Sequence, residues 1–85
     1  MKIARQEVAR KLLDYLQHHI TLAELVNWAE LAMMEGDFEE DFGDLRDIVA
    51  RLGLADVRAF GLTWEDCESL LSRLGYRAQV TVAKV

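Results

Sequence analysis

Hydrophobic residues recur every three or four positions along most of the chain, with charged residues on the positions between them. This is the period of an amphipathic helix that buries one face. It predicts helices over residues 3–18, 22–35, 45–52 and 64–74, with a short helical turn at 55–60. The residues expected to form the core of this mainly α, four-helix domain are Val8, Leu12, Leu16, Leu22, Leu25, Val26, Ala29, Met33, Leu45, Ile48, Val49, Leu52, Leu71 and Leu74.

Capping residues indicate where three of these helices begin. Thr21 and Glu24 have the spacing of a capping box, in which the hydroxyl and the carboxylate each accept a hydrogen bond from a free backbone N–H group. Thr63 and Asp66 repeat this arrangement before the last helix. Asp44 is expected to cap the third helix, since aspartate is a favoured residue at this position.

Glycines indicate where the elements end. Gly36 is expected to end the second helix with a left-handed backbone, and Gly53 to end the third with a Schellman motif that packs Leu54 against the helix. Gly61 and Gly75 close the two elements that follow. Glycines that are spread over element ends do not form the phosphate-binding loop of a nucleotide site.

The period of the pattern changes to two after Gly75. Residues 76–85 alternate and are rich in β-branched side chains, which is typical of a strand. One face of this strand holds the candidate dimer-interface residues Tyr76, Ala78, Val80 and Val82. No other segment is predicted to be a strand. We therefore expect a helical domain, residues 1–75, and a C-terminal β-strand extension, residues 76–85.

The predicted strand, residues 76–85, can be accommodated in three ways. It pairs with its copy in a second chain, it adds to the sheet of a different protein, or it forms a frayed tail or a continuation of the last helix. Pairing between two copies is favoured, because closed two-fold dimers are the commonest oligomers.

Acidic residues are concentrated in one segment. The chain has 85 residues, with 15 acidic and 10 basic side chains and a formal net charge of −5. Residues 35–47 contain a single basic residue, Arg46, and seven acidic ones: Glu35, Asp37, Glu39, Glu40, Asp41, Asp44 and Asp47. Three of them have the spacing of the first EF-hand ligands. However, Phe42 stands where that loop needs glycine and Ile48 where it needs a bidentate glutamate, so calcium binding is not expected.

Two interpretations of the acidic segment remain. In the first, the carboxylates attract a basic protein partner, and neighbouring aromatic side chains supply the anchors that charge alone lacks. The candidate partner-binding residues are then Glu35, Asp37, Phe38, Glu39, Glu40, Asp41, Phe42 and Trp28. In the second, the segment is a solvated connection whose acids complement the dipole of the following helix, and the aromatic residues cover the edge of the core.

The remaining chemistry-bearing residues do not form a recognisable catalytic or metal-binding set. His18 and His19 are adjacent on a helix and point about 100° apart, so they cannot bind one metal ion together. Cys67 lies among apolar positions and is expected to be a buried thiol. We therefore predict no enzymatic activity, no cofactor and no small-molecule substrate.

Charge and hydropathy also limit the partners. The acidic balance argues against nucleic acid, which requires a basic surface. No apolar run is long enough for a membrane span, which argues against a membrane partner. A single cysteine and the absence of an apolar leader predict a cytoplasmic protein.

The stretch 20–30, which contains Trp28-Ala29-Glu30, and the segment 53–75 resemble a loose set of short bacterial proteins. These proteins share a capped helix with a Trp-Ala-Glu-like motif, a Gly-Ala-Asp-like turn and a Thr-capped final helix. The resemblance implies a bacterial source and a small helical domain with no catalytic residue. Some of these proteins are similar in size and charge to antitoxin or immunity proteins, which is an analogy.

The sequence therefore predicts a non-catalytic protein–protein interaction module that forms a homodimer through residues 76–85. The alternative is an acidic immunity or antitoxin-type protein that neutralises a basic toxin or nuclease through residues 35–47.

Overall fold

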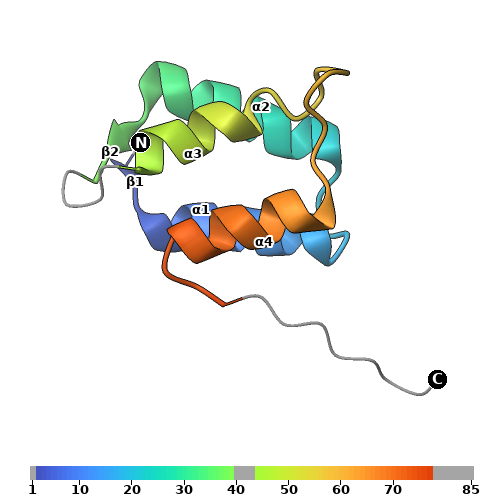
Figure 1. Ribbon diagram of the computed structural model, residues 1–85. Helices are drawn as coiled ribbons and strands as arrows, with labels where there is room; N and C mark the ends of the chain where they lie inside the picture. The colour runs from blue at the N-terminus through green and yellow to red at the C-terminus, as the bar shows by residue number, and fades with distance from the viewer. Residues whose placement is uncertain (1, 40–43, 78–85) are drawn as a thin grey trace.

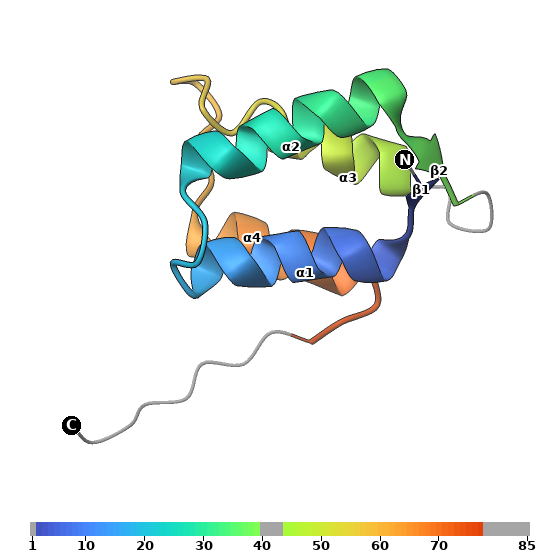
Figure 2. The same ribbon diagram turned by 180° about the vertical axis from the view of Figure 1, so that it is seen from behind.

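Four helices and two very short strands make up residues 2–39 and 44–77, which the computed structural model describes. In chain order these are β1 (Lys2–Ile3), α1 (Arg5–Leu16), α2 (Leu22–Glu35), β2 (Asp37–Phe38), α3 (Leu45–Leu52) and α4 (Trp64–Arg73). Figures 1 and 2 show two helix pairs, in which α1 lies beside α4 and α2 lies beside α3. The core fills the space between the pairs, and the domain is mainly α.

The two strands connect the N-terminus to the end of α2. They pair in parallel, with Ile3 opposite Phe38, and the Glu39 N–H donates a hydrogen bond to the Ile3 carbonyl at 3.0 Å. The prediction of a helix from residue 3 was therefore wrong, because α1 begins at Arg5. The prediction that no segment before Gly75 is a strand was also wrong. A two-residue strand is too short to show the alternation on which that prediction depended.

The helix starts at Thr21 and Thr63 are confirmed. Each threonine accepts a hydrogen bond from the backbone N–H three residues later at 3.1 Å. In return, Glu24 accepts one from Thr21 at 3.0 Å and Asp66 accepts one from Thr63 at 2.9 Å. Asp44 does not cap α3 with its side chain; its carboxylate instead accepts a hydrogen bond from Arg73 Nε at 3.4 Å. Asp44 therefore links α3 to α4.

Two helices end in Schellman motifs. At the end of α4, Gly75 has φ +90°, its N–H donates to Ser72 at 3.0 Å, and the Tyr76 N–H donates to Leu71 at 2.9 Å. At the end of α1 the same pair of hydrogen bonds surrounds His18, which has φ +61°. A non-glycine residue is uncommon in this conformation. The predicted helix end at Gly75 is confirmed by its positive φ angle, and Gly61, which also has a positive φ, follows hydrogen-bonded turns and no helix.

The other two predicted glycine stops do not have the expected backbone. Gly36 has φ −77° and ψ 143°, which is extended, because the chain passes directly from α2 into β2. Gly53 has φ −65° and ψ −16°, which is helical, and Leu54 is 41% exposed. Gly53 therefore does not form a Schellman motif, because the chain continues into hydrogen-bonded turns.

The predicted core is largely confirmed. Leu16, Leu22 and Met33 are only partly buried, and the other predicted core residues are buried. Further buried residues that were not in the predicted core are Ile3, Ala9, Ala32, Ala55, Cys67 and Leu70. Ile3 is fully buried among residues of the main cluster, so the N-terminal strand contributes a core side chain.

Candidate interaction surface

The acidic segment is tied into the fold where the structure describes it. Asp37 and Phe38 form β2, and Glu39 donates its N–H to β1. The Phe38 ring is half-buried against the core, and the Arg46 guanidinium carbon lies 4.7 Å from its centroid. One side of the Phe38 ring therefore packs against the edge of the core, and the Arg46 guanidinium lies over the ring. This arrangement supports the structural interpretation of Phe38 over its role as a free anchor.

Trp28 has a similar position on another side of the domain. It is half-buried on α2 and packs against the core, and the Lys11 ammonium nitrogen of α1 lies 5.7 Å from the ring centroid. Such a cation–π contact stabilises a partly exposed ring. Trp28 is thus a boundary residue between α1 and α2.

The other predicted partner-binding residues are only partly described. Glu35 and Asp37 are exposed at the end of α2 and the start of β2. Glu40, Asp41 and Phe42 lie outside the described residues, as do the dimer-interface candidates Ala78, Val80 and Val82.

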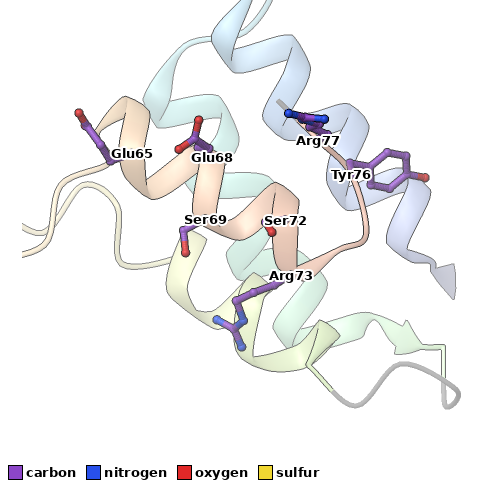
Figure 3. Close-up of a pocket in the computed structure, with 7 residues that line it drawn as sticks. All are labelled: Glu65, Glu68, Ser69, Ser72, Arg73, Tyr76 and Arg77. Atoms are coloured by element: carbon purple, nitrogen blue, oxygen red, sulfur yellow. The ribbon is translucent and has the colours of Figure 1, made fainter. Parts of the chain in front are cut away.

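Tyr76, the remaining dimer-interface candidate, borders a surface hollow on the outer side of α4 (Figure 3). The hollow has a volume of about 580 Å³, and all of its lining residues are exposed. They are Glu65, Glu68, Ser69, Ser72, Arg73, Tyr76 and Arg77. No lining residue is a histidine or cysteine, so the serines have no imidazole in the hollow to activate them.

The connection between α3 and α4 exposes three apolar side chains, of which the sequence analysis considered only Leu54 and expected it to pack against α3. Its hydrogen bonds join residues three apart, from the Val57 N–H to Leu54 and from the Phe60 N–H to Val57. These turns keep the segment on the surface of the domain, where the side chains of Leu54, Val57 and Phe60 are all exposed. Leu54 is 41% exposed, Val57 is 42% exposed and Phe60 is 51% exposed.

Arg51 holds this connection against α4. Its Nη2 donates hydrogen bonds to the Gly61 carbonyl at 3.1 Å and to Asp66 Oδ2 at 3.4 Å, and its guanidinium lies 5.6 Å from the Phe60 ring centroid. Hydrogen bonds from the backbone and side chain of Thr63, together with Arg51, hold the pKa of Asp66 below its ordinary value. One guanidinium thus joins α3, the connection and the capping box of α4.

Cys67 lies directly behind this capping box and is fully buried, as predicted. Burial raises the pKa of its thiol to about 11, with a further contribution from the Asp66 carboxylate. A thiol with a raised pKa is a poor nucleophile at neutral pH, because the thiolate is the reactive form.

The raised pKa of Cys67 predicts a loss of stability at high pH. The unfolded chain releases the thiol proton near pH 9.0, whereas the folded chain keeps it up to about pH 11. Loss of this proton stabilises the unfolded state relative to the folded state between these pH values, so the free energy of unfolding falls by roughly 2–3 kcal/mol as pH rises through them. Urea unfolding at pH 8 and pH 11 should show a smaller fall in stability for Cys67→Ala than for the wild type. An equal fall in both proteins would contradict the assignment.

Comparison of the chain with protein-family models, curated proteins and solved structures returned no match. The resemblance to short bacterial proteins therefore stays a prediction. Within residues 2–39 and 44–77, no helix has the length and apolar character of a membrane span. The same residues contain no group of three or more His, Cys, Asp or Glu side chains placed to hold a metal ion.

Proposed function

We propose that this protein is a non-catalytic interaction module that forms a homodimer by pairing residues 76–85 of two copies. The observation that carries the proposal is the end of α4. Gly75 adopts a left-handed backbone there, and the Schellman motif stops the helix before the alternating sequence begins. Tyr76 and Arg77 are accordingly outside any helix, and Tyr76 is 39% exposed.

The physical argument for pairing concerns backbone hydrogen bonds. A strand cannot satisfy its own N–H and C=O groups, and within the described residues β1 and β2 pair with each other. Pairing with the same segment of a second copy would satisfy the half of these groups that faces the partner strand and would place the alternating apolar side chains on one side of the ribbon. An interface of this kind is closed by its two-fold symmetry, because each copy contributes the same edge.

Two proline variants test the pairing. The N–H groups of adjacent strand residues point to opposite sides, so either Val80→Pro or Thr81→Pro must remove a donor between the strands. We expect at least one of them to convert the dimer to a monomer in size exclusion with light scattering. Val80→Ile keeps the donor and the β-branch and should remain dimeric. A dimer that survives both prolines would refute strand pairing.

A second candidate function is recognition of a basic protein partner, as in an immunity or antitoxin-type protein. The observation that favours it is a one-sided charge distribution: residues 21–39 include five acidic side chains and no lysine, arginine or histidine. Two of the aromatic residues proposed as anchors already lie in cation–π contacts within the domain, Phe38 with Arg46 and Trp28 with Lys11, so a partner would have to compete with these contacts. Apolar anchors free of such contacts would have to come from other residues.

A further inference from the structure

We propose that the outer face of α2 docks a basic amphipathic helix of a partner protein. This face presents the apolar side chains of Leu31 and Met34 together with Asn27 and Ala23, and it is bordered by Glu24, Glu30 and Glu35. The inference rests on the second candidate function, recognition of a basic partner. It places the binding surface on α2 and not on the acidic segment, residues 35–47.

The outer face exposes apolar surface that the fold does not use. Met34 is 80% exposed and Leu31 is 44% exposed, although α2 already buries Leu25, Ala29 and Ala32 in the core. Successive helical residues are rotated by about 100°, which places Leu31 and Met34 side by side on the face opposite the buried stripe. Met34 is the most exposed large apolar side chain of the described residues. Unbranched methionine adapts its shape to different partners.

Carboxylates border this apolar centre on both sides. The same rotation places Glu30 on the side toward α3, where its Cγ lies near the backbone of Gly53, and Glu24 and Glu35 on the opposite side. The ion pairs within the described residues use Asp14, Asp44 and Asp66, so Glu30 and Glu35 keep their charges available.

The negative charge of this face determines which kind of partner can bind to it. A second copy cannot cover this face with its own α2, because that helix contains three glutamates and no basic residue and would place like charges together. Nucleic acid and anionic lipid surfaces are repelled for the same reason. A helix with apolar residues along one stripe and lysine or arginine beside it complements both the centre and the borders. The 14 residues of α2 give a docking length of about 21 Å.

The test uses an 18-residue amphipathic helical peptide of leucine and lysine as the probe. The full chain is labelled with ¹⁵N and titrated with the peptide, and the affinity is measured by calorimetry. We expect the amide shifts to concentrate on residues 24–35. The double variant Leu31→Ser/Met34→Ser should bind at least tenfold more weakly, whereas Leu54→Ser/Val57→Ser, at partly exposed apolar positions elsewhere, should bind within about twofold of the wild type.

A matched pair of charge reversals separates a specific site from net charge. Glu30→Lys/Glu35→Lys should weaken binding at least tenfold, while Glu65→Lys/Glu68→Lys, the same charge change on α4, should have a much smaller effect. Equal weakening by both pairs would show attraction by net charge alone and would overturn the inference. Shifts confined to residues 36–39 would overturn the inference and leave recognition of a basic partner standing. The absence of any binding would overturn both.

Discussion

Ile3→Ala lowers the free energy of unfolding by about 2–5 kcal/mol, the range for truncating a fully buried isoleucine to alanine. Ile3 is 0% exposed and packs in the main core cluster, although it is the third residue of the sequence. Its removal leaves a cavity at the junction of β1, β2 and α1, which a domain of 85 residues cannot easily compensate. Urea unfolding followed by circular dichroism measures the effect.

Leu13→Ala is the matched control for this prediction. Leu13 lies on α1, close to Ile3 in sequence, but it is 48% exposed. Its truncation should cost less than about 1 kcal/mol, since little apolar area leaves contact with the protein. If Ile3→Ala were no more destabilising than Leu13→Ala, the N-terminal strand would not belong to the core.

Gly36→Ala destabilises the domain by about 2 kcal/mol, as expected for overpacking at a tight junction. A Cβ atom at this position would overlap the Ala32 carbonyl oxygen and lie 2.8 Å from Ile3 Cγ1. The backbone of Gly36 is extended, so the requirement for glycine here comes from close approach and not from conformation. The shift in the urea midpoint between wild type and variant gives the size of the effect.

Gly53→Ala separates close approach from a general effect of replacing glycine. The added Cβ would meet the Ala50 oxygen at 3.4 Å and other atoms at ordinary contact distances, and the backbone of Gly53 is helical. This variant should be neutral or more stable by up to about 1 kcal/mol, because alanine lowers the entropy of the unfolded chain. Equal destabilisation by both variants would refute the packing argument at Gly36.

The helices could be predicted from the sequence because their signals are local. Thr21 with Glu24, and Thr63 with Asp66, are three residues apart, and the structure contains both capping boxes. The apolar periodicity also identified all four buried residues of α3, and in α2 it identified Leu25, Val26 and Ala29. Backbone hydrogen bonds, side-chain caps and helical periods all act over a few residues, so one sequence is sufficient to recognise them.

The strands could not be predicted because their pairing is not local. Ile3 pairs with Phe38, and helices α1 and α2 lie between them in the sequence. Neither strand is long enough to show an alternation of apolar and polar residues. Gly36 was read as a left-handed stop for the same reason, because only the path into β2 shows that its backbone is extended. The role of Gly36 in close packing depends on Ile3, which lies far away in sequence.

The candidate surfaces were predicted only in part. The concentration of acids was evident from the sequence, but the covering of Phe38 by Arg46 and of Trp28 by Lys11 depends on how the elements pack. The exposed side chains Leu31 and Met34 were assigned no role, since an apolar residue on a polar helix face is individually unremarkable. Their significance follows from their exposure together with the surrounding carboxylates.

Homodimer formation through the C-terminal segment is tested most directly by light scattering after size exclusion on two proteins, the full chain and a truncation that ends at Gly75. We predict a dimer for the full chain and a monomer for the truncation, with helical circular dichroism retained in both because the described core lies before Gly75. Two proteins of the same oligomeric state, whether both are monomers or both are dimers, would contradict assembly through residues 76–85.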